Sequence, residues 1–454
     1  MALQSINPAT EEIFSKTEEL TNEQIKEKIT LADHTFAKWR TTTFEDRAKL
    51  INEVAKILRS EAQTIGEIMT KEMGKPIKQA IAEVEKCAWV CEYYAKEAPK
   101  FLTPEKITTD ASESLVRYDP IGIVLAIMPW NFPFWQVIRF AAPALMAGNV
   151  GLLKHASNVQ LAAKKIEEIF LRAGIPVGVF QNLAISSGKV ETIIRDPRVK
   201  AVTLTGSEHA GAKVAALAAS EIKKSVLELG GSDPFIVLED ADIANACSVA
   251  VTARNINNGQ SCIAAKRFIV VSSVAEEFKK LFKEKFEALK IGDPMAETTD
   301  IGPVVNKQAL EELENQIKKS VAAGAKILTG GKRVGNTGYF LQPTILTEVA
   351  PGMPAYHEEF FGPVASVIVV KDEAEAVQVA NDTHFGLGAS IWTSNISRAK
   401  QLIPQIDAGA VFVNGLVKSD PRLPFGGEKR SGFGRELSHH GIKEFVNIKS
   451  VWIK

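Results

Sequence analysis

The sequence has no excess of charge of one sign. Lysine and arginine together number 54, and so do aspartate and glutamate. Proteins that bind nucleic acid or an anionic membrane surface are typically basic over the binding region, so neither partner is indicated. Long apolar runs are also missing. Residues 121–128 form one of the longest, and a bilayer-spanning helix needs about 20 residues.

Cysteine is scarce, with four in 454 residues. They form neither a disulfide framework nor a paired C-x-x-C zinc pattern, so we expect no metal site. Free thiols fit a reducing compartment. The N-terminal residues lack the apolar segment of a secretory signal, so we predict a cytoplasmic protein. Nucleotide motifs are missing too: there is no P-loop, and no G-x-G-x-x-G opens the first strand–helix unit.

The apolar pattern changes its period along the chain. Helical spacing comes first, with a capping box at Thr21 and Gln24 and helices predicted over 44–73 and 78–98. From residue 121, short apolar runs alternate with helical segments, which is typical of a parallel, doubly wound α/β sheet. A second α/β series covers about 231–425. Segments 112–118 and 445–453 alternate like strands outside both cores, which suggests an oligomerisation element.

Cys262 is the candidate nucleophile. It follows Asn257-Asn258-Gly259-Gln260-Ser261, just before the apolar run 268–271, so it is predicted on a loop. Cysteine attacks as the thiolate, so its surroundings decide whether it reacts. Taken alone, a single cysteine is more often an inert residue of the core.

Polar residues follow several of the predicted strands, where open parallel sheets place their sites. The amide of Asn131 suits a developing oxyanion, and Glu228 in an apolar strand end suits a general base. Lys154 can reach a ribose or phosphate, and residues 205–211 form a helix start suited to a phosphate. Each has an ordinary structural alternative: a turn, a surface lysine, a helix cap or a buried, hydrogen-bonded Glu. Together they indicate thiol attack on a carbonyl beside a nucleotide cofactor.

Five separated motifs, in order, resemble the aldehyde dehydrogenase superfamily. The resemblance runs from Asn7 to the C-terminus, and within the superfamily it is strongest to the succinate-semialdehyde dehydrogenases that prefer NADP. The motifs are Pro129-Trp130-Asn131-Phe132-Pro133, Leu227-Glu228-Leu229-Gly230-Gly231, Gly259-Gln260-Ser261-Cys262, Glu359-Phe360-Phe361-Gly362-Pro363-Val364 and Pro424-Phe425-Gly426-Gly427-Glu428-Lys429-Arg430-Ser431-Gly432.

The resemblance implies a role for each matching residue. Cys262 would be the nucleophile, Asn131 and the Cys262 backbone N–H the oxyanion donors, and Glu228 the base that activates water. Residues implied to bind the cofactor are Met128, Trp130, Lys154, Ser157, Gly206, Ser207, Leu229, Glu359 and Phe361. Residues implied to bind the substrate are Trp135, Arg139, Ser261 and Ser419.

The resemblance also implies a domain plan and an assembly. Residues 1–104 and 120–230 would form a Rossmann-like cofactor-binding domain, and 231–430 an α/β catalytic domain. Residues 105–119 and 431–454 would form an oligomerisation ribbon with a C-terminal strand. We therefore expect a homodimer or a homotetramer.

One departure from the family bears on the cofactor. Many members read Lys-Pro-Ser-Glu where this chain reads Lys154-His155-Ala156-Ser157. The family glutamate holds the adenine-ribose hydroxyls of NAD, and it would repel a 2′-phosphate. Ser157 would not repel it, so we predict that NADP is preferred and that NAD is used less well.

Arg139 indicates an aldehyde that also carries a carboxylate. In succinate-semialdehyde dehydrogenases an arginine at this place binds that carboxylate, and the guanidinium can bind it through two hydrogen bonds. Some relatives have a second arginine six residues before the nucleophile, where this chain has Ile256. Broader aldehydes and other semialdehydes, such as glutarate semialdehyde, therefore stay open.

Two rival functions remain. A CoA-acylating dehydrogenase would use the same thiol and pass its acyl group to CoA, although Glu228 favours hydrolysis. A catalytically silent binding or structural protein on the same scaffold would need none of Cys262, Glu228 and Asn131, all of which are present.

Overall fold

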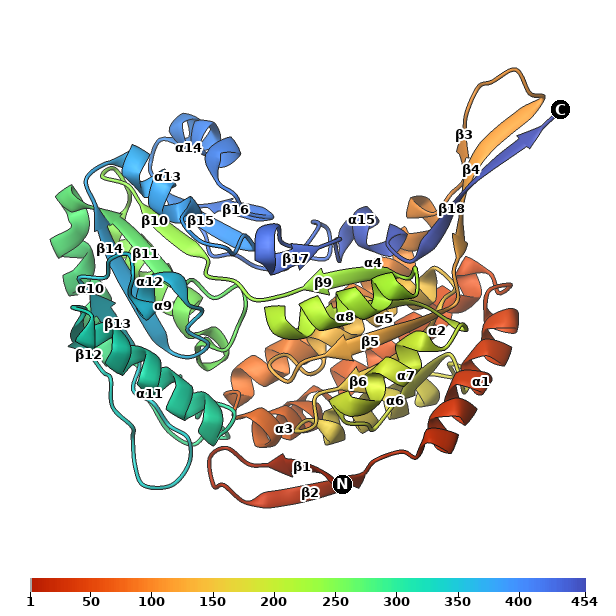
Figure 1. The fold of residues 1–454 in the computed structure, drawn as a ribbon, viewed down its shortest axis with the longest axis horizontal. Helices are drawn as coiled ribbons and strands as arrows, with labels where there is room; N and C mark the ends of the chain where they lie inside the picture. Colours follow the sequence, from red (N-terminus) through yellow and green to blue (C-terminus); the bar gives the residue numbers. More distant parts are fainter. Residues whose placement is uncertain (1) are drawn as a thin grey trace.

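Two large sheets covered by helices form the body of the protein, and a narrow ribbon projects from it (Figure 1). The computed structural model describes residues 2–454. The α/β fold class predicted from the sequence is confirmed by parallel sheets with crossover helices.

The six-stranded sheet brings the first set of predicted site residues to one edge. Its order is β17-β9-β8-β5-β6-β7, parallel except for the β17–β9 pair. Thr205 pairs with Glu228, and Met128 with His155, so neighbouring strands end level. The strands are β5 (Ile123–Met128), β6 (Val150–His155), β7 (Phe180–Asn182), β8 (Val199–Thr205), β9 (Lys224–Glu228) and β17 (Gly432–Phe433).

The second large sheet has seven strands, and the loop that carries Cys262 leads into one of them, β11. Its order is β12-β13-β14-β11-β10-β15-β16, and only the β12–β13 pair is antiparallel. The strands are β10 (Pro234–Val237), β11 (Arg267–Val271), β12 (Lys326–Thr329), β13 (Thr344–Thr347), β14 (Val364–Val370), β15 (Gly388–Trp392) and β16 (Ala410–Val413). The sequence pattern did not predict β10, β13 and β15, because runs of four or five apolar residues are too short to show a period.

Four helices precede the sheets: α1 (Asn22–Trp39), α2 (Phe44–Ser60), α3 (Ala62–Met73) and α4 (Ile77–Phe101). The capping box at Thr21 and Gln24 is confirmed. The single helix predicted over 44–73 is wrong, because the chain turns at Glu61 between α2 and α3. The Glu61 carboxylate pairs with Lys165 and Arg172 of α6 (Gln160–Arg172), and α3 packs on that helix. Apolar spacing alone cannot show such a tertiary contact.

The remaining helices cover the faces of the two sheets. They are α5 (Trp135–Met146), α7 (Val190–Arg195), α8 (Glu208–Ser220), α9 (Ile243–Asn255), α10 (Ala275–Glu287), α11 (Lys307–Ala322), α12 (Pro354–His357), α13 (Glu373–Asn381), α14 (Ile396–Leu402) and α15 (Ser438–Lys443). Within residues 2–454, no helix is both long and apolar enough to cross a membrane. The same residues contain no cluster of three or more His, Cys, Asp or Glu placed to hold a metal ion.

The two segments predicted as ribbon strands pair with each other. Strand β18 (Val446–Ile453) runs antiparallel to β4 (Glu113–Pro120), and β3 (Glu105–Lys106) adds to the other edge of β4. The ribbon projects from the body in Figure 1. A separate hairpin, β1 (Ala2–Ile6) with β2 (Ile13–Glu18), lies at the N-terminal end. The predicted domain boundaries remain a prediction, and β17 joins the six-stranded sheet from the segment assigned to the ribbon.

A buried ion pair anchors the start of α5, the helix that follows Asn131. Lys75 and Glu83 are nearly inaccessible and form a salt bridge with each other. Glu83 Oε1 also accepts the backbone N–H groups of Phe134 at 3.0 Å and Trp135 at 2.9 Å. Helix N-termini leave such N–H groups without partners inside the helix. Glu83 therefore couples α4 to the loop that carries Asn131.

Replacing Glu83 with Ala should destabilise the protein strongly, because it leaves the Lys75 ammonium buried without a partner. Breaking a buried pair in this way costs about 3–5 kcal/mol, and it should lower the apparent Tm by several degrees in a thermal melt. Glu85→Ala is the matched control, since Glu85 lies on the same helix and makes an exposed pair with Arg59. Such exposed pairs contribute roughly 0–1 kcal/mol. Equal losses in both variants would contradict the anchoring role.

Candidate active site

Cys262 lies on a loop between α9 and β11, as its sequence context predicts. The two residues that precede Gly259 adopt left-handed backbone angles: Asn257 has φ 56° and Asn258 has φ 58°. Gly259 continues the turn at φ 75°, and a Cβ atom there would lie 2.3 Å from the Gly362 backbone. Asparagine and glycine tolerate this conformation best. The Asn-Asn-Gly run thus turns the chain sharply before Cys262.

Two buried side chains, those of Arg254 and Asn258, hold this loop through hydrogen bonds to backbone carbonyls. Arg254 donates to the carbonyl oxygens of Gly259 at 2.5 Å and Ala265 at 3.0 Å. Asn258 Nδ2 donates to the Gly74 and Pro303 carbonyls at 2.8 and 2.9 Å. Because buried carbonyls need partners, these contacts fix the loop backbone and with it the position of the thiol.

Lys266 completes the support directly behind the thiol. Its Nζ donates to the carbonyls of Ser261 and Cys262, both at 2.8 Å, and pairs with Glu359 at 3.1 Å. Glu359 Oε1 also accepts the Gly231 N–H at 3.1 Å. The buried Lys266 ammonium therefore links the loop of Cys262 to the motif Glu359-Phe360-Phe361-Gly362.

Asn131 is oriented toward the Cys262 loop. Its Nδ2 donates to the Gln260 carbonyl at 3.1 Å, while its Oδ1 accepts from Gln136 Nε2 at 3.1 Å. The Gln136 contact assigns the amide orientation, because oxygen and nitrogen are otherwise hard to distinguish. Among residues 2–454, the Cys262 backbone N–H has no hydrogen-bond acceptor. The Asn131 amide and this N–H are the pair of donors that an oxyanion requires.

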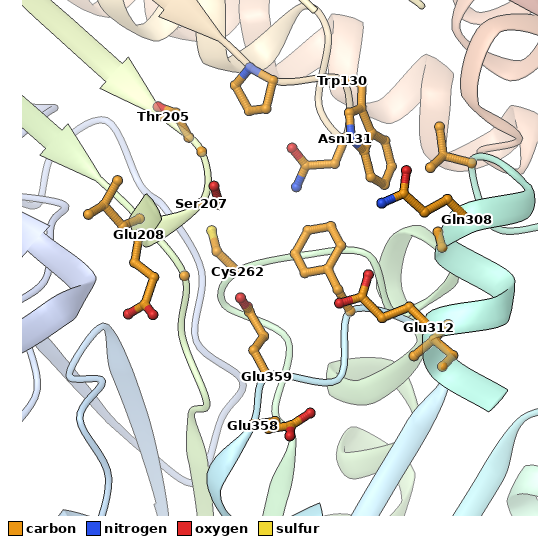
Figure 2. A pocket seen from close by; sticks show the side chains of 18 of the residues that line it. Trp130, Asn131, Thr205, Ser207, Glu208, Cys262, Gln308, Glu312, Glu358 and Glu359 are labelled. Carbon is orange, nitrogen blue, oxygen red and sulfur yellow. The ribbon is translucent and has the colours of Figure 1, made fainter. Parts of the chain in front are cut away.

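Two cavities meet at Cys262. The first, of about 610 Å³, is lined by Trp130, Asn131, Gly206, Glu359 and other residues, and Figure 2 shows Cys262 between Asn131 and Glu359. The second, of about 530 Å³, is lined by residues of α4, α5 and the Leu416–Ser419 loop. Cys262 and Gln136 line both. The thiol can therefore meet one molecule from each side.

The first cavity fits a nicotinamide dinucleotide. Trp130 and Phe361 lie edge to face, with ring centroids 5.8 Å apart. The N-terminus of α8 lines the cavity, and Ser207 caps it by accepting the Ala210 N–H at 3.3 Å. The free N–H groups of a helix start attract phosphate. Trp130, Gly206, Ser207, Leu229, Glu359 and Phe361, which the sequence predicts to bind the cofactor, all line this cavity.

Three residues predicted to bind the cofactor lie outside the cavity lining. Lys154 and Ser157 lie at and beyond the end of β6, where Lys154 pairs in register with Ile127 of β5. Lys154 is largely buried and Ser157 is exposed. Met128 is buried at the end of β5. Of the three, Met128 directly precedes Pro129, which lines the cavity, and the cofactor-binding roles of all three stay predictions.

His155 ties the end of β6 to the motif that contains Asn131. Its Nδ1 accepts the Ala156 N–H at 2.9 Å, so Nε2 carries the proton and donates to the Pro133 carbonyl at 2.9 Å. Burial lowers the pKa of His155 to about 4, which keeps the ring neutral. The family proline at this position offers no such hydrogen bond.

The Cys262 thiol holds its proton tightly in the structure. Burial raises the pKa of Cys262 to about 12, and the positive charges of Arg139 and Lys266 only partly oppose this. The side chain remains partly accessible from both cavities. A thiolate here gains stability chiefly from nearby positive charge and hydrogen-bond donors.

Glu228 is buried beside a second carboxylate. Neither of its carboxyl oxygens has a hydrogen-bond partner among the described residues. Burial first, and then the charge of Glu436, raises the pKa of Glu228 well above its usual value against the pull of Arg139. A carboxylate with a raised pKa is a stronger base near neutral pH.

Arg139 lines the second cavity but is already engaged by protein groups. Its Nε lies 2.5 Å from Glu436 Oε2, its Nη2 donates to Thr205 Oγ1 at 3.3 Å, and the guanidinium covers the Phe425 ring at 4.8 Å. Nη1 makes no hydrogen bond within residues 2–454. Arg139 can thus donate to a ligand, while Glu436 compensates its charge.

The other residues predicted to bind substrate also line the second cavity. Trp135, Ser261 and Ser419 are buried in its wall. The Trp135 Nε1 and Ser261 Oγ atoms are buried and have no hydrogen-bond partner among the described residues.

Sequence reasoning missed several residues of the site. Gln136, Lys266 and Glu436 orient Asn131, the nucleophile loop and Arg139, and Lys86 enters the second cavity from α4. Only Gln136 carried a signal, since it follows Asn131 by five residues at a helix start. The others reach the site from distant segments.

Comparisons with known proteins agree with this geometry. The model of the aldehyde dehydrogenase family matches residues 1–451, and the chain belongs to that family. It is 54% identical to a probable succinate-semialdehyde dehydrogenase (NADP(+)) of Synechocystis sp., over 100% of both chains.

Two further proteins extend the likeness. Succinate-semialdehyde dehydrogenase (NADP(+)) 1 of Mycobacterium tuberculosis is 51% identical over 100% of both chains. The crystal structure of succinic semialdehyde dehydrogenase from Streptococcus pyogenes in complex with NADP+ superposes with a TM-score of 0.98, at 40% identity and 100% coverage of both chains.

Proposed function

We propose that this protein oxidises succinate semialdehyde to succinate, with NADP+ as the preferred oxidant and NAD+ as a poorer one. One observation carries the proposal: Cys262 lies where a cavity suited to a dinucleotide meets a second cavity lined by cations. Relatives with this printed activity, aligned over the full chain, support it.

The first step is addition of the Cys262 sulfur to the aldehyde carbon. The thiol loses its proton to cavity water as the carbon–sulfur bond forms, and the carbonyl oxygen becomes an oxyanion. Asn131 Nδ2 and the Cys262 N–H stabilise that charge. Removing one such donor from an enzyme typically costs about 2.7–4 kcal/mol of transition-state stabilisation.

NADP+, when bound, would supply the hydride acceptor that allows the thiohemiacetal on Cys262 to become a thioester. Trp130, Phe361 and the start of α8 would hold the cofactor in the first cavity. Glu228 then takes a proton from water, the hydroxyl adds to the thioester, and the acid leaves as the Cys262 sulfur is expelled. The net reaction consumes one aldehyde, one NADP+ and one water, and it yields one acid, one NADPH and one proton.

The second cavity supports a substrate with a carboxylate tail. Arg139 offers Nη1, the Ser419 hydroxyl adds a polar contact, and Trp135 and Ser261 complete the wall. Ile256 also lines the cavity, at the place where some relatives have a second arginine. Glutarate semialdehyde and plain aldehydes are therefore the competing substrates to test.

The ribbon supports assembly into a homo-oligomer. Ile448, Trp452 and Ile453 of β18 are exposed, at 64%, 53% and 49%. Apolar residues on an unpaired edge strand favour pairing with another chain. We keep the homodimer and the homotetramer as alternatives and the cytoplasm as the compartment, consistent with the four free cysteines.

A substrate panel tests the function. Succinate semialdehyde should be oxidised with NADP+ at a kcat/KM at least about 10-fold above that of butanal, which has the same chain length without the carboxylate. Turnover should proceed without CoA, because water is the acyl acceptor. Strict dependence on CoA would support the acylating rival. An equal kcat/KM for butanal would favour a broad aldehyde dehydrogenase.

Replacing Glu228 with Gln should trap the thioester, because the amide cannot accept the proton of water. Rapid mixing should show a burst of about one NADPH per active site, followed by turnover slowed about 10²–10⁴-fold. Intact mass spectrometry should detect the acyl group on Cys262.

In the unaltered enzyme, kcat should rise with pH as Glu228 ionises at its raised pKa, and the variant should lose that rise. Glu221→Gln, at the far end of α8, is the control, and a burst-free variant with full turnover would exclude Glu228 as the base.

Replacing Ser157 with Glu should reverse the cofactor preference. A carboxylate beside the 2′-phosphate site repels that phosphate, so kcat/KM with NADP+ should fall by at least about 10-fold while NAD+ is retained. Ser157→Gln is the matched control because it adds the same bulk without charge. If Ser157→Glu leaves the NADP+ preference unchanged or increases it, Ser157 does not set the choice.

A further inference from the structure

The cations of the second cavity differ in how far protein carboxylates compensate them. Lys75, Lys86 and Arg139 line its wall, and the exposed Lys78 and Lys418 are also among its lining residues. Buried and half-buried charges determine which ligand a cavity accepts, because water screens them less than exposed ones.

Two of the three inner cations already have a carboxylate partner. Lys75 pairs with Glu83, and Arg139 pairs with Glu436 at 2.5 Å. Each pair is close to neutral when seen from the cavity. A substrate carboxylate at Arg139 would gain a hydrogen bond there but would compete with Glu436 for the charge.

Lys86 is the exception among the three. Its Nζ donates to the Ser419 hydroxyl at 2.7 Å and lies 4.1 Å from the centroid of the Trp135 ring. Among the described residues, no carboxylate oxygen lies within 4.0 Å of it. The charges of Glu83 and Asp420 act on Lys86, but these carboxylates are bound to Lys75 and Arg422. Lys86 is thus a half-buried ammonium whose charge is not paired with a carboxylate among the described residues.

Ser419 is arranged to act with Lys86. The Ser419 oxygen accepts a hydrogen bond from the Lys86 ammonium, so the hydroxyl hydrogen of Ser419 stays free to donate. Both side chains line the cavity that ends at Cys262. A carboxylate there would accept one hydrogen bond from the ammonium and one from the hydroxyl.

We propose that Lys86, together with Ser419, is the principal anchor for the substrate carboxylate, and that it sets the preference for semialdehyde acids over uncharged aldehydes. The inference rests on the proposed function and deepens it. Arg139 then adds one hydrogen bond, pairs with Glu436 and opposes the charge of Glu228, while Lys86 supplies the uncompensated charge.

The anchor should depend on pH. Burial first, and then the charge of Arg139, lowers the pKa of Lys86 to about 8, while Cys87, Glu83 and Asp420 oppose the shift. Lys86 is charged below that pH and loses its charge above it. KM for a semialdehyde acid should therefore rise above pH 8, relative to KM for butanal measured at the same pH.

The decisive variant is Lys86→Met, which keeps the stem that packs on Trp135 and removes the charge. We expect KM for succinate semialdehyde to rise at least about 10-fold, in line with a hydrogen bond between charged groups. Its kcat should stay within about twofold, and KM and kcat for butanal should not rise or fall by more than that. Unchanged butanal turnover also shows that the variant is folded.

Two further variants separate charge from structure. Lys86→Arg keeps a charge that does not titrate in this range, so it should restore a low KM and remove its rise above pH 8. Lys96→Met is the matched control, since Lys96 is an exposed lysine of the same helix whose side chain is 82% accessible. It should behave like the unaltered enzyme.

The outcomes distinguish this inference from the proposed function. If the unaltered enzyme prefers succinate semialdehyde and Lys86→Met keeps both that preference and a low KM, the anchor is elsewhere and only this inference falls. If the unaltered enzyme shows no preference over butanal, the proposed function fails and the inference fails with it. A kcat loss shared by both aldehydes in Lys86→Met would assign the residue a structural role and overturn the anchor.

Discussion

The site depends first on the turn that presents Cys262. Two asparagines and a glycine in left-handed conformation reverse the chain between α9 and β11. This backbone is costly to hold, and buried partners hold it: Arg254 and Lys266 bind loop carbonyls from within the protein. Because these cations are buried, their hydrogen bonds are not weakened by water. The thiol therefore has a fixed position against which the other groups are arranged.

Compensation of buried charge is the second constraint. Glu228 and Glu436 lie close enough for the charge of one to raise the pKa of the other, and Arg139 is the cation beside both. Removing Arg139 would leave the buried Glu436 without a partner, and removing Glu436 would do the same to Arg139. Arg139 thus both lines the second cavity and opposes the charges of Glu228 and Glu436. Lys86 lines the same cavity without a carboxylate partner among the described residues.

The location of Cys262 between two cavities links structure to chemistry. Three strands of the six-stranded sheet end at the same level, at Met128, Thr205 and Glu228. The first cavity, which suits a dinucleotide, therefore forms at their carboxyl ends. The other cavity is built by α4, α5 and the Leu416–Ser419 loop. The thiol of Cys262 lines both cavities and is therefore accessible to a molecule in either one.

The sequence by itself determined the fold class and the family, and it predicted Cys262 as the nucleophile. Motifs such as Leu227-Glu228-Leu229-Gly230-Gly231 and Gly259-Gln260-Ser261-Cys262 are contiguous in the chain and can be read without the structure. The sequence also placed Trp130, Ser207 and Phe361 in one site. Only the tertiary structure decided that Glu436 compensates Arg139, that Gln136 orients Asn131, and that Lys86 enters the cavity uncompensated. The physical reason is distance along the chain. Lys86 and Ser419 are 333 residues apart, and folding alone brings their charge and hydroxyl together.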